Sequence, residues 1–106
     1  MLSPKLQTAI NAQINLELAS SYAYLAMASH FDANSLPGMS NWMRVQSEEE
    51  RVHAMKLYDH MGDRGGQVVL GAIPAPNHEF ATPLAVFEAA LHHEQVVTKS
   101  IHALYA

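Results

Sequence analysis

Helix-starting signals at three prolines constrain this chain more than any other feature. Ser3-Pro4 and Thr82-Pro83 each place a good N-cap residue before a proline in the first helical position, where the missing N–H costs nothing. Pro37 follows a run of turn-forming residues. The sequence therefore predicts three helices, over residues 4–31, 37–64 and 83–106.

Each expected helix carries an apolar stripe, because spacings of three, four and seven residues bring side chains onto one helical face. In the first helix the stripe contains Ile10, Glu17, Tyr24 and Phe31. In the second it contains Met39, Met43, Gln46, Glu50, His53, Leu57 and His60. In the third it contains Leu84, Phe87, Leu91, Glu94, Val97, Ile101, Leu104 and Tyr105.

The two connections differ in length, and this difference sets the helix directions. The first spans about six residues and can only join antiparallel neighbours. Residues 65–82 contain Gly and Pro without periodicity, and such a connection reaches roughly 55 Å, more than the ~40 Å length of the second helix. The third helix is therefore expected to begin beside the start of the second and to run parallel to it.

Three amphipathic helices predict one all-α domain over residues 1–106. They leave an apolar groove where a four-helix bundle would have its last helix, and the third helical pattern reaches Ala106 without a stop signal. An apolar groove of that size is not left to water in a monomer. We therefore expect the chain to be truncated and the groove to be covered.

Composition and charge exclude several classes of protein. With 106 residues, 49% hydrophobic and 15% charged, the chain is a single folded module. A net charge of -4 gives no basic surface for nucleic acid, and the absence of Cys excludes disulfides and thiolate metal sites. No apolar stretch approaches the ~20 residues of a membrane span, and no signal peptide is visible. A cytoplasmic protein without membrane or nucleic-acid partners is expected.

Three glutamates occupy the middle of the three stripes. Glu17, Glu50 and Glu94 lie near the midpoints of their helices and, given the helix directions, at one height. Burying unpaired carboxylates together is costly, and no Lys or Arg falls on the stripes at that height. His53 follows Glu50 by three residues and shares its face. The pattern indicates a metal cation, and Glu50 is placed to bridge two ions.

An alternative interpretation is that these glutamates are solvated because one helix is rotated about its axis. The chain has seven His and seven Glu, so a Glu-x-x-His pair arises readily by chance and is a weak signal alone. The shared height and face of the two further carboxylates strengthen it. Oxygen-rich ligation with one His suits iron that cycles between ferrous and ferric better than it suits zinc.

Four segments resemble the helices of bacterial non-haem ferritins. They are Asn15–Tyr22, Glu48–Ala54, Arg64–Gln67 and His93–Gln95, and the resemblance covers the whole chain in register. It implies a ferritin-like four-helix bundle with a long crossover between the second and third helices. Members of the family continue through a fourth long helix and a short fifth helix, and this sequence lacks both.

The resemblance also implies roles for individual residues. Glu17, Glu50 and His53 match the first iron site of the family, Glu50 and Glu94 match the second, and Glu49 matches a carboxylate of the third. Tyr24 matches the tyrosine beside the di-iron centre. The haem methionine of bacterioferritins would fall at Arg51, so no haem is expected.

The activity implied by the resemblance is iron storage by a ferroxidase, an oxidoreductase that oxidises Fe(II) with O2 at a di-iron centre. Glu17, Glu50, His53, Glu94 and Tyr24 are the expected catalytic residues. The Fe(III) mineral is stored inside a shell of 24 subunits in the family, so Fe2+, O2 and further copies of the chain are the expected partners. Two alternatives remain open: a non-catalytic helical assembly unit, and a half-site that two chains complete together.

Overall fold

The computed structural model describes residues 2–105 as three helices. α1 spans Pro4–Ala33, α2 spans Pro37–Asp63 and α3 spans Pro83–Tyr105, and no strand occurs in this part of the chain. The all-α class is therefore confirmed. Ala106, which ends the third expected helix, and the side chain of Tyr105 lie outside the described residues.

The helix ends follow from local capping chemistry. The Ser3 Oγ accepts a hydrogen bond from the Leu6 N–H at 3.1 Å and caps α1. The Thr82 Oγ1 accepts one from the Ala85 N–H at 3.1 Å, before α3. α2 ends ahead of Gly65, whose φ of 75° lies in the left-handed region that glycine adopts at little cost.

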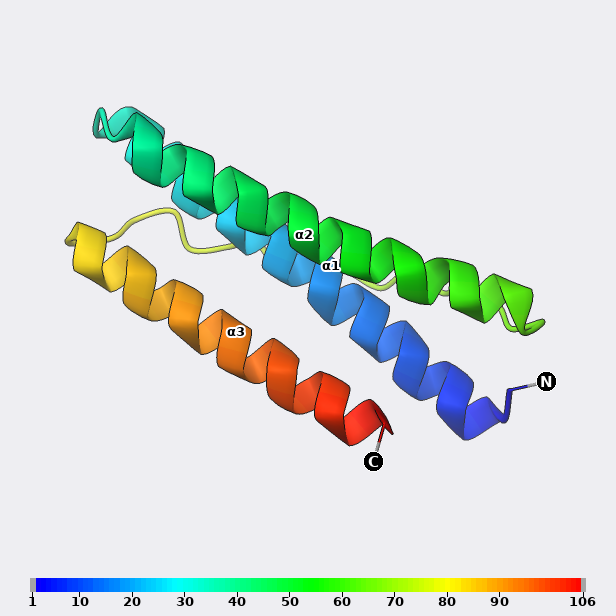
Figure 1. The fold of residues 1–106 in the computed structure, drawn as a ribbon. Coiled ribbons are helices and arrows are strands. Elements are labelled where there is room, and N and C mark those ends of the chain that lie inside the picture. The colour runs from blue at the N-terminus through cyan, green and yellow to red at the C-terminus, as the bar shows by residue number, and fades with distance from the viewer. Residues whose placement is uncertain (1, 106) are drawn as a thin grey trace.

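α1 is the helix that holds the other two together (Figure 1). It runs antiparallel to both, so α3 is parallel to α2, as the connection lengths predict. Among the described residues, no Cα atom of α2 lies within 8 Å of a Cα atom of α3. Their contact is made by side chains such as Trp42 and Phe87, whose ring centroids lie 5.7 Å apart. α2 and α3 are therefore each packed more closely against α1 than against one another.

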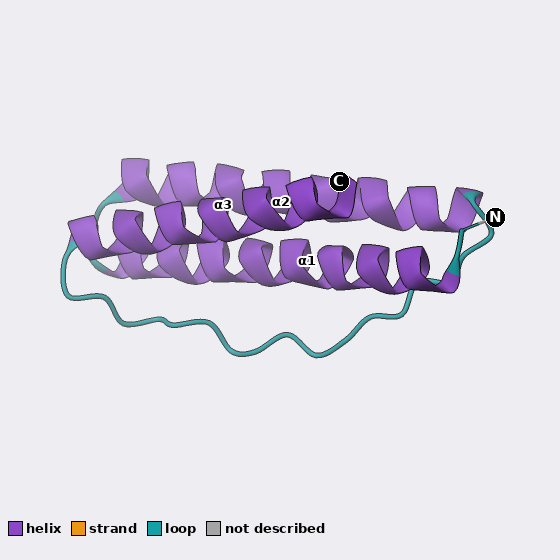
Figure 2. Cartoon of the chain, turned by 90° about the horizontal axis from the view of Figure 1, so that it is seen from below, coloured by secondary structure: helices purple, strands orange, loops and turns teal. Residues whose placement is uncertain are grey.

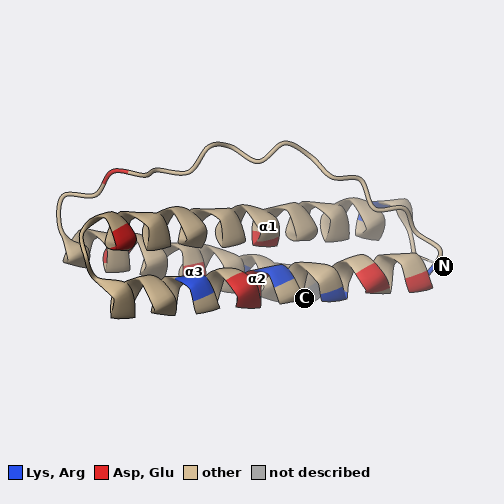
Figure 3. Ribbon diagram, turned by 90° about the horizontal axis from the view of Figure 1, so that it is seen from above, with Lys and Arg blue, Asp and Glu red and all other residues tan. Residues whose placement is uncertain are grey.

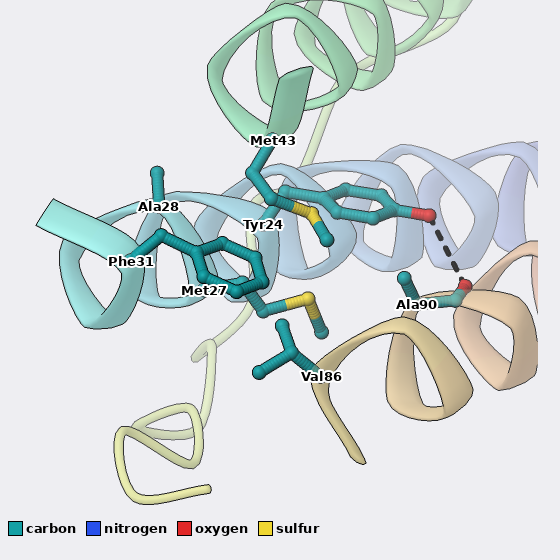
Figure 4. Packing of buried hydrophobic residues seen from close by; sticks show 7 residues of the cluster. All are labelled: Tyr24, Met27, Ala28, Phe31, Met43, Val86 and Ala90. Carbon is teal, nitrogen blue, oxygen red and sulfur yellow. Dashed lines mark hydrogen bonds between the residues drawn. The ribbon is translucent and has the colours of Figure 1, made fainter. Parts of the chain in front are cut away.

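The apolar core consists of two separate clusters. The first joins all three helices and contains Tyr24, Met27, Ala28, Phe31, Met43, Val86 and Ala90 (Figure 4). The second joins the other ends of α1 and α2 and contains Ile10, Ile14, Ala54, Leu57 and Met61. Each large side chain buried here contributes roughly 1.5–3 kcal/mol. The two clusters fix the ends of the α1–α2 pair and leave its middle to polar residues.

The crossover between α2 and α3 runs along the length of the bundle beside α1 (Figure 2). Two asparagines of α1 hold its backbone through both atoms of their amides. The Asn11 Nδ2 donates to the Gln67 carbonyl at 3.1 Å, and the Asn11 Oδ1 accepts from the Val69 N–H at 2.9 Å. Asn15 holds Gly71 and Ala72 in the same way, with two bonds of 3.1 Å. These amides give a segment without secondary structure a fixed path.

The predicted stripe of the third helix is wrong in part. The side chains of Leu84 and Leu91 are 67% and 58% exposed, whereas Val86 and Ala90 are buried. The reason is that α3 packs its backbone against α1 alone, so only a narrow face is covered. In α2, Met39 and His60 of the predicted stripe are likewise exposed.

Charged side chains are distributed unevenly over the helices (Figure 3). α1 carries only Lys5, Glu17 and Asp32, because it packs against both other helices, and α2 carries most of the rest. Among residues 2–105, no helix combines the length and the hydrophobicity that crossing a membrane requires.

Candidate metal centre

Two carboxylates and one imidazole meet between α1 and α2. Glu17 of α1 is 0% exposed, and Glu50 of α2 is 3% exposed. The Nδ1 atom of His53, one turn beyond Glu50, lies 3.8 Å from the Glu17 Oε2 and 3.9 Å from the Glu50 Oε2. One ligand atom from each residue falls within 4.8 Å of the others, a spacing that can hold a metal ion. Sequence analysis placed Glu17 and Glu50 at one height and His53 on the same face as Glu50.

The two carboxylates have no protein cation to compensate them. The Glu17 Oε2 and the Glu50 Oε2 are buried without a hydrogen-bond partner. Among the described residues, no Lys or Arg nitrogen lies within 4 Å of either group, and the arginine ion pairs are exposed ones to Asp32 and Glu48. Burial, together with the neighbouring Glu17 and Glu94 carboxyl groups, raises the pKa of Glu50 to about 9. The site therefore favours an added positive charge.

Glu94 of α3 approaches the same region through Tyr24. The Tyr24 hydroxyl donates to the Glu94 Oε1 at 2.6 Å. Its oxygen also lies 3.3 Å from the Ala90 carbonyl oxygen, a longer and weaker contact that Figure 4 draws. Burial, and then the bond to Glu94, raise the pKa of Tyr24 far above its usual value, so the phenol keeps its proton. Glu94 lies outside the group of three but close enough to raise the pKa of Glu50. Tyr24 thus orients the carboxylate that α3 contributes.

Glu49 and His53 differ in their relation to the centre. Glu49 is exposed, and the structure does not bring it into the group of Glu17, Glu50 and His53. The His53 side chain is 50% exposed, although its Nδ1 atom lies beside both buried carboxylates. The centre is therefore dry on the carboxylate side and reachable from solvent on the His53 side.

Sequence reasoning missed the polar residues that support the centre. Gln13 is buried, its Nε2 donates to the Glu17 Oε1 at 3.1 Å, and its Oε1 accepts from the Ser100 hydroxyl of α3. Ser21 and Ser47 each donate through Oγ to the carbonyl of the other at 2.7 Å and so join α1 to α2. The position of Gln13, one helical turn before Glu17 on the same apolar face, could have predicted this contact.

The donor set fits a divalent metal ion that prefers oxygen ligands and tolerates one nitrogen. Two unpartnered carboxylate oxygens and one imidazole nitrogen converge, with a third carboxylate nearby. Iron suits such a set, whereas structural zinc sites favour closed nitrogen and sulfur shells. The fit rests on buried oxygen atoms that lack any partner within the protein.

An antiparallel helical bundle with glutamates and a Glu-x-x-His pair directed inward defines the class of helical carboxylate metalloproteins. The family model described as a ferritin-like domain matches residues 7–106, which is nearly all of the chain. The chain belongs to the ferritin family.

Individual relatives agree with this membership. The chain is 43% identical over 104 residues to a bacterial non-heme ferritin of Staphylococcus saprophyticus and 41% identical to one of Bacteroides fragilis. These matches cover 98% of the chain but only 62% and 65% of the two relatives.

Solved ferritins from Archaeoglobus fulgidus share the fold. A structure described as an open-pore ferritin superposes with a TM-score of 0.94, at 52% identity, over 97% of this chain and 63% of that chain. An engineered closed form of the same ferritin gives a TM-score of 0.95, at 52% identity, over 98% and 63%. The chain thus spans less than two thirds of the length of these relatives.

Proposed function

We propose that this chain is a ferroxidase and iron-storage subunit, which binds Fe(II) at Glu17, Glu50 and His53 and oxidises it with O2 in the cytoplasm. The observation that carries the proposal is the pair of buried, unpartnered Glu17 and Glu50 oxygens beside the His53 nitrogen. Membership in the ferritin family supports it, and so does the converging donor set.

The residues divide the work according to their surroundings. Glu17 and Glu50 neutralise the charge of the incoming Fe(II), and the buried walls around them exclude water. Glu94 is the ligand proposed for a second iron, with Glu50 shared between the two, and the Tyr24 hydroxyl orients it. Glu49, exposed beside Glu50, is proposed for a third iron site. A haem is not part of the proposal, because Arg51 stands where the haem methionine of bacterioferritins would fall.

The decisive experiment is Fe(II) oxidation in air, followed by the near-ultraviolet absorbance of Fe(III). Glu50→Ala should abolish the rapid phase, because it removes the carboxylate that faces both proposed iron positions. Glu88→Ala removes an exposed carboxylate of α3 that does not belong to the group of Glu17, Glu50 and His53, and it should leave the rate unchanged. Equal rates for Glu50→Ala and the parent chain would contradict the proposal.

Storage requires that copies of the chain assemble. We propose self-association into a ferritin shell, 24 subunits by family resemblance, since the fold matches ferritins closely. Light scattering after size-exclusion chromatography tests this directly. A monomer that remains a monomer after iron loading would contradict shell formation.

A second candidate function follows from the loose packing between α2 and α3. Within the described part of the chain, no Cα atoms of these helices lie within 8 Å of each other, and the His53 side chain is half exposed. In that case the centre is a half-site that another chain completes, or the chain is a non-catalytic helical assembly unit. Anaerobic Fe(II) titration separates these functions: two irons per monomer support the ferroxidase, two irons only in an oligomer support the half-site, and at most one weakly bound iron supports the assembly unit.

A further inference from the structure

A buried glutamine links the candidate centre to α3. Gln13 is 2% exposed and lies one helical turn before Glu17 on the same face of α1. Its Nε2 donates to the Glu17 Oε1 at 3.1 Å, and its Oε1 accepts from the Ser100 Oγ at 2.5 Å. An uncharged but strongly polar side chain in this position is costly to bury unless its hydrogen bonds are made.

The chemistry of the three groups fixes the direction of both bonds. A carboxylate can only accept, so the amide must present its NH2 group to Glu17. This leaves the amide oxygen facing α3, where it requires a donor. The Ser100 hydroxyl is that donor. The chain of bonds Ser100 to Gln13 to Glu17 therefore has a single consistent orientation.

This chain of bonds divides the two oxygens of Glu17 between different tasks. The Oε1 atom is occupied by the Gln13 amide, whereas the Oε2 atom is buried without a partner and lies 3.8 Å from the His53 Nδ1. Oε2 is therefore the oxygen that faces His53 without a competing hydrogen bond, whereas the bond from Gln13 competes with any use of Oε1 as a second ligand. If both oxygens were free, the carboxylate could rotate and chelate one ion.

We propose that Gln13 is a positioning residue that holds Glu17 as a one-oxygen ligand, with Ser100 anchoring it from α3. The inference rests on the proposed function, because it assumes that a metal binds at Glu17, Glu50 and His53. Groups that orient a metal ligand through a hydrogen bond typically change metal affinity by about 10–100-fold when they are removed. Gln13 thereby sets both the geometry and the strength of the site.

The bond from Ser100 also links the position of α3 to the metal centre. The backbone of α3 packs against α1 alone, so each hydrogen bond between these two helices helps to fix the position of α3. Ser100 and Glu94 are on the same helix, and both are bonded to residues of α1, Gln13 and Tyr24. A shift of α3 would therefore reach Glu17 and Glu94 together.

Cobalt(II) tests the proposal, because its visible absorbance weakens as its coordination number rises. Gln13→Met keeps the length of the side chain and removes both hydrogen bonds, and Gln67→Met makes the same change at an exposed position of the crossover. We expect Gln13→Met to bind Co(II) about 10–100-fold more weakly and with lower absorbance per ion. Gln67→Met should match the parent chain.

A second pair of variants covers the case in which Gln13→Met does not fold. Ser100→Ala removes only the anchor and should weaken Co(II) binding less than Gln13→Met does, and Ser100→Thr should restore it by returning a hydroxyl. A metal-free readout accompanies them: the carboxyl carbon resonance of Glu17 should shift in Gln13→Met but not in Gln67→Met. Unchanged Co(II) affinity and absorbance in both Gln13→Met and Ser100→Ala would overturn the positioning role.

The two proposals fail in distinguishable ways. If the parent chain binds no Co(II), the metal centre itself is refuted and the positioning role falls with it. If the parent chain and Gln13→Met bind Co(II) alike, only the positioning role is refuted. A merely structural Gln13 would lower the stability of the variant without altering the absorbance of the bound ion.

Discussion

The energetic cost of Glu50 in the metal-free chain is open to direct measurement. Burial and the adjacent carboxyl groups raise its pKa from 4.5 to about 9 in the folded chain, whereas the unfolded chain keeps the lower value. Between pH 4.5 and about pH 9, Glu50 keeps its proton in the folded state and releases it in the unfolded state. The free energy of unfolding therefore falls as the pH rises above 4.5. At about 1.4 kcal/mol per pH unit, the loss reaches about 3 kcal/mol at pH 7.

Replacing Glu50 by Gln removes this titration while keeping the shape of the side chain. The new amide also has an N–H to offer the unpartnered Glu17 Oε2. We therefore expect metal-free Glu50→Gln to be about 1–3 kcal/mol more stable than the parent chain at pH 7, with the gain shrinking toward zero near pH 4.5. Urea unfolding in the presence of a chelator measures the difference, and Glu88→Gln is the exposed control.

Adding metal should reverse the order of stability. An ion that binds only the folded state contributes about 2.7 kcal/mol at 100 times its Kd, and Glu50→Gln should lose most of that gain along with a ligand. If Glu50 destabilises the metal-free chain but stabilises the metal-bound chain, its position favours metal binding over stability. The reasoning is refuted if metal-free Glu50→Gln is no more stable than the parent at pH 7, or if the difference does not change with pH.

Two further predictions concern the frame around the centre. In a double-mutant cycle, Ser21→Ala and Ser47→Ala should show a coupling of about 0.5–1.5 kcal/mol, because each hydroxyl bonds the carbonyl of the other residue; additive losses in urea unfolding would contradict this. Asn15→Ala should lower the free energy of unfolding by about 1 kcal/mol and speed hydrogen exchange at the Gly71 N–H, because both bonds of the amide are lost. The Val69 N–H, which Asn11 holds, should stay protected, and equal exchange at both sites in the variant would contradict this.

The helix starts and directions could be predicted because they depend on local chemistry and chain length. Ser3-Pro4 and Thr82-Pro83 carry their own capping groups, and the length of the crossover leaves room for α3 to run parallel to α2. The helix starts and the helix directions together predict that Glu17 and Glu50 lie side by side. Neither prediction requires knowledge of the tertiary contacts.

The rotation of α3 about its axis could not be predicted. Its apolar stripe is wide enough to cover two neighbours, whereas the described chain offers it the backbone of α1 only. The narrow face that is buried contains Val86 and Ala90, and Leu84 remains exposed. Periodicity reports which side chains are apolar, but which of them become buried depends on how many neighbours are present.

The polar contacts of the crossover and of Gln13 escaped prediction for a different reason. Asn11, Asn15 and Gln13 all lie on α1, and their partners in the crossover and in α3 are 56 or more residues away in the chain. Only the bond from Gln13 to Glu17 is local. The periodicity of a helix does not identify such distant partners. A buried amide needs hydrogen bonds, but many polar groups along the chain could supply them. The pairs become visible only once the backbone places the partners together.

The arrangement of the core explains why the centre favours a cation over a rearrangement. One apolar cluster, containing Phe31 and Met43, and another, containing Ile14 and Met61, clamp α1 to α2 on either side of Glu17 and Glu50. Moving the two carboxylates apart would separate the helices and expose both clusters, at a cost of several large apolar side chains. The remaining ways to relieve the repulsion are a proton, which the raised pKa of Glu50 reflects, or a metal ion that also takes the His53 nitrogen. Packing at the two ends thus holds the two carboxyl groups together at the proposed metal centre.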